Sequence, residues 1–316
     1  MAIIFGRNTF IKAGEETTWG TPVSTTVSSR VLNVDLSRVQ ERSQSVSLST
    51  GDAGYSQGFF DGLENTGGSI ENLVYYEGSG IFFKAALGSV ATTGAGPTYV
   101  HTYSPSLTLP SLSIEVQRGS GSREKFEGSK ISTYSLSFEA GGEMTANMEI
   151  ISETASARNS SPISPSYGTG RQVLHFEAST FSFNGTAYDL RSMTLTIDNK
   201  LERRNLLGSK LSAEPATNDI REVTLECTAD IESASENTLY NESIDGNQAN
   251  CEITFTNSDS DILEIKLFNS VILSYSDSIG TTGRIERTWT MQGYSDSSNP
   301  SVHLKVTNQQ ASAIAN

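Results

Sequence analysis

The sequence predicts a mainly β protein, organised as two tandem β-sandwich or β-barrel domains that each carry one short flanking helix. Three observations lead to this prediction. Apolar and polar residues alternate over residues 112–152, a similar pattern returns over residues 262–293, and only 36% of the residues are hydrophobic, with Ser, Thr and Gly abundant. Alternation with a period of two is typical of strands with one buried and one wetted face, and this composition suits sheets better than helical bundles.

The first alternating stretch predicts three strands. Residues 114–116 and 134–138 alternate apolar with polar side chains, and residues 144–150 do the same. The segment EAGGE at residues 139–143 lies between the last two strands and predicts a hairpin turn.

The second alternating stretch, near the C-terminus, repeats this design. It predicts strands at residues 262–268, 271–275 and 284–293, with a Ser- and Gly-rich turn before the last of them. The recurrence is the reason to expect two related domains.

The N-terminal residues 1–28 are polar and are expected to form an irregular arm. Trp19 lies in this arm, and a lone tryptophan in a polar segment is usually an anchor onto another surface, either of its own domain or of a neighbour. The first strand is expected at residues 31–39.

Residues 41–68 lack clear periodicity and are rich in Ser and Gly. So long a segment is uncommon inside a compact domain, so we expect a projecting loop or long hairpin there. Its aromatic residues, Tyr55, Phe59 and Phe60, are the candidate contact residues. A plain mobile loop is the alternative.

The clearest helix is predicted over residues 79–88. Ser79 is a suitable N-cap, Ala and Leu favour the helix interior, and Gly88 occupies the position where helices commonly end. Strands are expected on either side, at residues 69–75 and 99–103.

A Ser-, Pro- and Gly-rich stretch at residues 154–171 predicts the domain boundary. Beyond it, Asn184-Gly185 between alternating apolar residues predicts a tight hairpin. The predicted organisation is an N-terminal arm (1–28), a first β-domain (29–160) with the projecting loop (41–68), a second β-domain (161–300) and a C-terminal tail (301–316).

The two halves share an order of elements, although few residues are identical. We align residues 33–43 with 196–205, the 69–75 strand with 223–231, and the predicted helix with the more polar segment 236–246, which also ends in Gly. A duplication of one small β-domain is the hypothesis that explains this order.

The net charge is −14 and the isoelectric point is near 4.7. A surface that grips nucleic acid would be basic, so tight DNA or RNA binding is not expected, although an acidic surface could repel DNA and let it slide past. Cys227 and Cys251 lie in or beside alternating strands and are expected to be small buried residues. We find no secretion signal, and the chain is expected in the cytoplasm during its synthesis.

No catalytic constellation or cofactor site is predicted. His101, His175 and His303 lie on separate strands, away from any nucleophile motif. The acidic residues of the NSDSDILE segment lack the number and glycine of a calcium loop, and the GSGSR turn at residues 119–123 lies between strands rather than before a helix. We therefore expect no enzyme activity, no metal and no cofactor.

The N-terminal GEETTWGTP segment, the long polar loop, the helix IFFKAALGS and the closing strand RIERTWTMQG resemble the major tail tube proteins of long-tailed (siphovirus-type) bacteriophages. The resemblance covers nearly the whole chain. It implies a virion structural protein, made in the host cytoplasm, whose subunits form stacked rings around a β-barrel lumen. Double-stranded DNA would pass through that lumen without specific binding.

The resemblance also implies partners. These are further copies of the chain, the tape-measure protein inside the tube, and the tail terminator and distal tail proteins. Family rings usually hold six tube domains, so two domains per chain imply a homotrimer with pseudo-sixfold symmetry, and a decoration domain in the second half would imply a homohexamer. By analogy, the N-terminal arm and residues 41–68 reach the adjacent ring.

Two other classes stay open on the sequence alone. One is a surface adhesin or carbohydrate-binding β-sandwich, which the missing secretion signal and the two tryptophans disfavour. The other is a hydrolase on a β-scaffold, which the absence of a nucleophile or metal motif disfavours.

Overall fold

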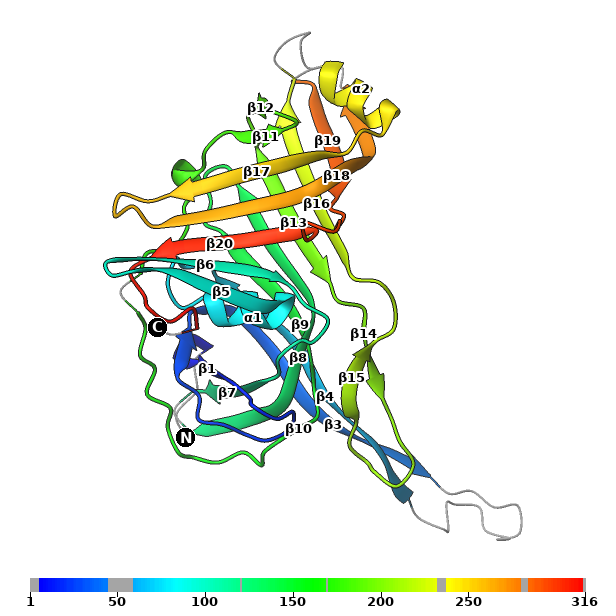
Figure 1. Ribbon diagram of the computed structural model, residues 1–316. Coiled ribbons are helices and arrows are strands. Elements are labelled where there is room, and N and C mark those ends of the chain that lie inside the picture. Colours follow the sequence, from blue (N-terminus) through cyan, green and yellow to red (C-terminus); the bar gives the residue numbers. More distant parts are fainter. Residues whose placement is uncertain are drawn as a thin grey trace, which may run out of the picture.

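Strands make up most of the computed structural model, which confirms the mainly β prediction (Figure 1). The structure describes residues 6–44, 59–119, 121–168, 170–231, 237–279 and 284–314. In that part of the chain, neither α-helix has the length and apolar content needed to cross a membrane.

The elements of the N-terminal half are η1 (Gly6–Asn8), β1 (Phe10–Glu15), β2 (Val27–Ser29), β3 (Val31–Gln44), β4 (Phe59–Leu73), α1 (Gly80–Leu87), β5 (Gly88–Ala95), β6 (Thr98–Pro105), β7 (Leu112–Arg118), β8 (Ser122–Glu139), β9 (Thr145–Ser152) and β10 (Thr154–Ala155). Those of the C-terminal half are η2 (His175–Glu177), β11 (Phe181–Phe183), β12 (Thr186–Tyr188), β13 (Ser192–Asp198), β14 (Leu201–Arg204), β15 (Ala213–Thr217), β16 (Glu222–Asp230), α2 (Asn237–Asp245), β17 (Ala249–Thr256), β18 (Ile262–Ser278), β19 (Glu286–Gln292) and β20 (Val302–Asn308).

Eight antiparallel strands form one continuous sheet across both halves, in the order β3–β4–β9–β8–β13–β16–β19–β18. We call it the long sheet. Strands β14 and β15 pair only with each other, and the other strands extend, directly or through a neighbour, from the first parts of the two longest strands, β8 and β18. On β8 the order is β2–β1–β7–β8–β10, and on β18 it is β12–β11–β17–β18–β20–β6–β5.

The strands of the two halves pair in the same pattern. The pairings β1–β2, β1–β7, β7–β8, β8–β10, β8–β9, β9–β4 and β4–β3 have the counterparts β11–β12, β11–β17, β17–β18, β18–β20, β18–β19, β19–β16 and β16–β13. Even the irregularities agree, because β8 has a register shift between Ile131 and Thr133 and β18 has one between Ile272 and Ser274. The β5–β6 hairpin is an addition to the first half in this comparison.

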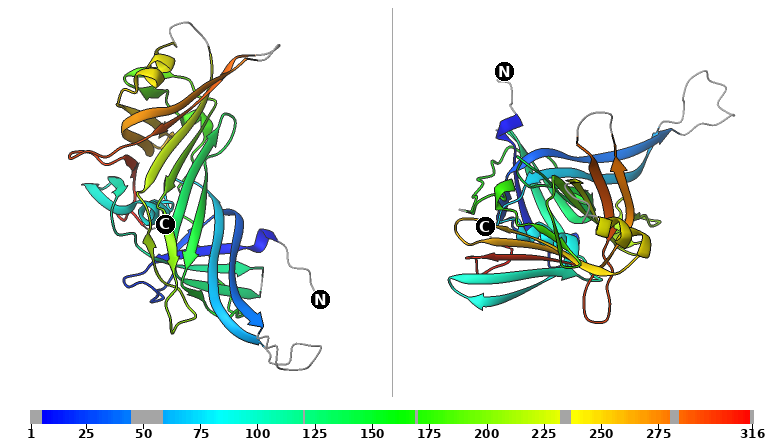
Figure 2. Two further views of the ribbon diagram at one scale, coloured as in Figure 1. Left: turned by 90° about the vertical axis from the view of Figure 1, so that its right-hand side faces the viewer. Right: turned by 90° about the horizontal axis from the view of Figure 1, so that it is seen from above.

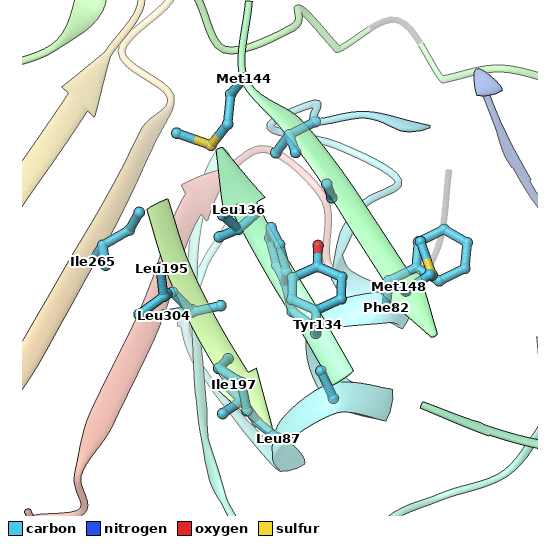
Figure 3. Packing of buried hydrophobic residues seen from close by; sticks show 14 of the residues in the cluster. Phe82, Leu87, Tyr134, Leu136, Met144, Met148, Leu195, Ile197, Ile265 and Leu304 are labelled. Atoms are coloured by element: carbon cyan, nitrogen blue, oxygen red, sulfur yellow. The ribbon is translucent and has the colours of Figure 1, made fainter. Parts of the chain in front are cut away.

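The hydrophobic core lies under the inner face of the long sheet. Figure 3 shows Tyr134 and Leu136 of β8 beside Leu195 and Ile197 of β13, with α1 underneath them. Phe83 of α1 is fully buried, and its ring meets the rings of Tyr103 and Tyr134 edge to face at 5.5 and 6.1 Å. Apolar residues of both halves therefore share one core.

Several local predictions are confirmed. The helix lies at α1, with Gly88 in the left-handed region at φ 107°. Asn184 and Gly185, at φ 50° and 76°, make the two-residue turn between β11 and β12. Ser79 is an exception, because its hydroxyl accepts the Tyr75 N–H at 2.9 Å instead of capping the helix.

Other expectations were wrong. Residues 1–28 are not an irregular arm throughout, because β1 pairs with both β2 and β7 and Ile11 is fully buried. The expected C-terminal tail contains β20, which lies between β18 and β6. The two strands expected at 262–268 and 271–275 are one strand, β18.

We predict that Phe83→Ala lowers the free energy of unfolding by about 3–5 kcal/mol, because it leaves a cavity under two buried tyrosines. Urea unfolding of the purified chain measures the change. The matched control is Phe59→Ala, at a phenylalanine that is 66% exposed, which should change stability by less than about 0.5 kcal/mol. Equal effects of the two substitutions would contradict the packing described here.

Candidate functional site

The outer face of the long sheet is its most regular polar surface. Residues facing one another on successive strands form transverse rows; one row is Asp35, Ser69, Glu149, Thr133, Asp198 and Glu222. In the adjacent row, one residue along each strand, the side chains lie on the opposite face, in or against the core. This row is Val34, Ile70, Met148, Tyr134, Ile197 and Val223. The strand alternation thus separates a hydroxyl- and carboxylate-rich face from the core.

This outer face carries nine carboxylates: Asp35, Glu71, Glu139, Glu149, Asp198, Glu222, Glu226, Asp230 and Glu286. Cations at the ends of the strands neutralise some of them. Lys200 bridges Asp198 and Glu222 at 2.7 and 2.8 Å, and these carboxylates raise the pKa of its amine. Arg284 and Arg191 bind Asp230, and with burial opposing them they lower the pKa of that carboxyl. The face as a whole keeps an excess of negative charge.

Within the long sheet, the two halves meet where β8 pairs with β13. We call this contact the seam; it joins residues 133–139 to residues 192–198 in seven successive pairs. The side chain of Asn199, just beyond the seam, donates to the carbonyl oxygens of Ala86 and Ile131 at 3.0 Å, and accepts from Arg221 at 2.6 Å. This buried amide satisfies a carbonyl at the end of α1, so the seam is held by polar as well as apolar contacts.

The long sheet ends in two strands that have a neighbour on one side only. Among the described residues, β3 pairs with β4 alone, and residues 271–278 of β18 pair with β19 alone. Open edges of this length present unpaired N–H and C=O groups to any strand that approaches.

Two hairpins extend in the same direction beyond the ends of the strands of the long sheet. Figure 1 shows β3–β4 and β14–β15 leaving the body together, and Figure 2 shows the β3–β4 hairpin projecting in both perpendicular views. They are tied to each other, because Glu64 N–H donates to the Lys210 carbonyl at 2.8 Å and the Lys210 amine bonds Asp61 at 2.8 Å. The hairpins therefore act as one projection.

The projection carries exposed apolar side chains. Phe59 and Phe60 are 66% and 57% exposed, and Arg42 lies over the Phe59 ring at 5.5 Å. Leu206 and Leu207, between β14 and β15, are 54% and 106% exposed. These leucines were not among the contact residues predicted from the sequence, although two adjacent apolar residues in a polar turn were the available signal.

The candidate contact residues named from the sequence do not come together in one place. Phe59 and Phe60 lie on the projection, whereas Tyr55 lies outside the described residues. Trp19 rests on its own chain, where the indole N–H donates to the Gly128 carbonyl at 3.1 Å. The neighbouring Glu16 is buried and accepts from Ser111 and Ser113 at 2.7 and 2.8 Å.

Glu64 anchors the base of the projection. Its carboxylate accepts hydrogen bonds from Arg38 at 2.7 Å, Thr154 at 2.6 Å and Thr66 at 3.2 Å, and its side chain is 3% exposed. Burial raises the pKa of this carboxyl, but the hydrogen bonds outweigh burial, and the net pKa is below the ordinary value.

The residues considered for chemistry have structural partners. His101 is buried and contacts Thr92, Asn308 and Gln310. Cys227 and Cys251 are buried free cysteines, as expected, and burial raises the pKa of both thiols. No group of His, Cys, Asp or Glu side chains in the described ranges has the arrangement of a metal site.

Comparison with known proteins identifies a matching protein family. A family model described as "Phage tail tube protein" matches residues 6–293. Among solved structures, a chain of the cryo-EM structure of the anti-feeding prophage (AFP) baseplate, 6-fold symmetrised, has a TM-score of 0.26 and 10% identity, over 52% of this chain and 89% of that chain. That similarity is too low to carry an argument. No match was found among curated proteins.

We predict that Glu64→Gln destabilises the chain at pH 7 by about 1–3 kcal/mol, because it weakens three hydrogen bonds to a buried carboxylate. The folded pKa of Glu64 is below the unfolded one. Its contribution is therefore present above the unfolded pKa and is lost as the pH falls through the folded pKa.

Urea unfolding of both proteins between pH 7 and pH 3 tests this. The difference between the variant and the unmodified chain should shrink at the acid end. A difference that stays constant over this range would show that the charge of Glu64 does not support the fold.

Proposed function

The chain belongs to the phage tail tube protein family, and from this premise we propose that it is the repeating subunit of a hollow tail tube through which double-stranded DNA passes. Family membership makes it a structural component of a phage tail and not an enzyme. The observation that carries the proposal is the long sheet, which combines a polar outer face with an open edge at each end. A sheet with two open edges can be closed into a wall by further copies of itself.

The polar face of the long sheet is the proposed lumen wall. Its carboxylates and hydroxyls suit contact with water, and its excess negative charge repels DNA phosphates instead of binding them. Five of its carboxylates have no ion pair recorded among the described residues: Asp35, Glu71, Glu139, Glu149 and Glu226. The net charge of −14 is consistent with the same role.

We further propose that the chain contains two copies of one tube domain. The seven matched strand pairings and the matched register shifts in β8 and β18 support this. The copies would run from β1 to β10 and from β11 to β20, which replaces the boundaries expected from the sequence. The hairpins β3–β4 and β14–β15 are then equivalent projections.

With two domains per chain, three chains complete a ring of six domains, so the proposed ring is a homotrimer with pseudo-sixfold symmetry. Rings stack into the tube, with the tape-measure protein inside during assembly and the tail terminator and distal tail proteins at its ends. The assembled location is the tail of the virion.

Electron microscopy of the purified chain at high concentration tests these proposals. We expect tubes of stacked rings, each with three two-lobed subunits. Rings of six chains would keep the tube and reject two tube domains per chain. A chain that stays monomeric under all assembly conditions would contradict the tube function itself.

The projection of β3–β4 and β14–β15 is proposed to contact the adjacent ring. We predict that the double substitution Phe59→Ser with Phe60→Ser leaves the fold intact but abolishes long tubes, because it removes apolar contact area at the stacking surface. Leu206→Ser with Leu207→Ser should act in the same direction. Tube length by electron microscopy and monomer stability by urea unfolding are the measurements.

The matched control is Leu107→Ser, at a leucine that is 101% exposed and lies outside the projection. It should assemble normally. Tubes of ordinary length from both double variants would rule out stacking through these side chains.

A further inference from the structure

The strand pairings of the two halves correspond pair by pair around β8 and β18. Ile131 pairs with Ile150 on one side of the β8 irregularity, and Ile272 pairs with Met291 on the same side of the β18 irregularity. On their other side, β8 pairs with β7 and β18 pairs with β17. There the pair Leu112–Ser129 corresponds to the pair Ala249–Ser270. Residues 133–137 of β8 therefore correspond to residues 274–278 of β18.

The same comparison relates β3 to β13. Leu36 faces Gly68 of β4, which faces Ile150 of β9. Leu195 faces Leu225 of β16, which faces Met291 of β19. Because Ile150 corresponds to Met291, Leu36 corresponds to Leu195, and residues 35–39 of β3 correspond to residues 194–198 of β13.

The first half uses its β8 edge to pair with β13 at the seam, while the corresponding β18 edge has no partner within the described chain. The helices beside these edges also correspond. Phe83 of α1 meets Tyr134 edge to face at 6.1 Å, and Tyr240 of α2 meets Tyr275 edge to face at 5.7 Å.

The two edges differ in how much of their apolar side chains is buried. Phe83, Leu87 and Phe138 are 0%, 0% and 9% exposed at the first edge, where α1 lies against β5, β6 and β8 and where β13 pairs with β8. Their counterparts Tyr240, Ile244 and Ile279 are 49%, 69% and 75% exposed. Leu273, also on β18, is 54% exposed. The second edge therefore combines unpaired backbone with uncovered apolar side chains, which together indicate a protein partner.

We propose that the partner is a second copy of this chain, whose β3 pairs antiparallel with β18 in the register of the seam. This inference rests on the proposed tube function and specifies its lateral contact. The predicted pairs are Ser274 with Val39, Tyr275 with Arg38, Ser276 with Ser37, Asp277 with Leu36 and Ser278 with Asp35. They correspond in order to the seam pairs Thr133–Asp198, Tyr134–Ile197, Ser135–Thr196, Leu136–Leu195 and Ser137–Thr194.

The side chains are compatible with this register. Ser276 and Ser37 both lie on the polar face, so the face continues across the contact without a change of chemistry. On the inner face, the Arg38 guanidinium, which already binds Glu64 and the Ala155 carbonyl, comes opposite the Tyr275 ring, and its planar face can make a cation–π contact while these bonds are kept. One β3 acceptor is already engaged, because Arg118 donates to the Leu36 carbonyl at 2.7 Å, and a carbonyl oxygen can accept a second bond.

Cysteine crosslinking tests the register. The double variant Ser276→Cys with Ser37→Cys places thiols at a predicted pair, and both positions are exposed in the single chain. They lie at opposite ends of the long sheet, so a disulfide between them joins two copies. The native cysteines are each 1% exposed and contribute little background.

We expect mild oxidation of assembled tubes to give covalent dimers and closed trimers on non-reducing electrophoresis. The matched control, Ser276→Cys with Asn33→Cys, moves one thiol four residues along β3, roughly 13 Å away. It should crosslink at least tenfold less. If the first pair disturbs assembly, Ser274→Cys with Val39→Cys tests the same register.

The outcomes separate the two proposals. Tubes that crosslink through the control pair as well as through the predicted pairs, or through neither predicted pair, would overturn the register and leave the tube function standing. Failure of the unmodified chain to form tubes would overturn the tube function and this inference with it.

Discussion

The hydrogen-bonded pairing of β8 with β13 is the constraint on which the rest of the structure depends. It turns two groups of four strands into one sheet, and it places Tyr134, Leu136, Leu195 and Ile197 in a single core (Figure 3). Because side chains alternate along a strand, a slip of one residue at this seam would turn the core side chains outward. The seam therefore sets both the polar face and the apolar face over their whole width.

The seam also explains why the long sheet has two open edges. A sheet that grows by adding a unit of four strands keeps one open edge at each end, whatever the number of units. In the first unit, β13 of the next unit pairs with the β8 edge, and α1 is buried against β5, β6 and β8. In the second unit, α2 and the end of β18 lack such cover within the described residues, and apolar side chains such as Ile244 and Ile279 are exposed. Lateral assembly of further copies would satisfy both the backbone groups and these side chains.

Carboxylates and exposed apolar side chains are concentrated on different parts of the molecule. Nine carboxylates lie on the open face of the long sheet, while Phe59, Phe60, Leu206 and Leu207 are exposed on the projection of β3–β4 and β14–β15. Glu64 connects the two regions, because its hydrogen bonds to Arg38 and Thr154 hold the projection on the sheet. The proposed tube function would use this division, because a wall of like charge repels the phosphates of DNA and exposed apolar side chains suit contact with the next ring.

The sequence by itself determined the local elements. Period-two alternation identified most strands, Asn184-Gly185 identified a hairpin, Gly88 marked the end of α1, and the two cysteines were expected in the core, because each of these depends on a few neighbouring residues. The resemblance of the chain to tail tube proteins also came from the sequence, and the family model agrees with it. The roles of Trp19, Tyr55, Phe59 and Phe60 at contacts between subunits stay predictions.

Only the tertiary structure decided which strands are neighbours. Backbone hydrogen bonds are the same for every residue, so alternation shows which face of a strand is buried but not which strand pairs with it. For this reason β1 and β20, which lie in the expected N-terminal arm and C-terminal tail, could not be recognised as inner strands. For the same reason the alignment of residues 33–43 with 196–205 was four residues out of step with the strand pairing, in which Leu36 and Leu195 occupy corresponding positions. Register is a property of the assembled sheet, because it is set by the packing of both faces at once.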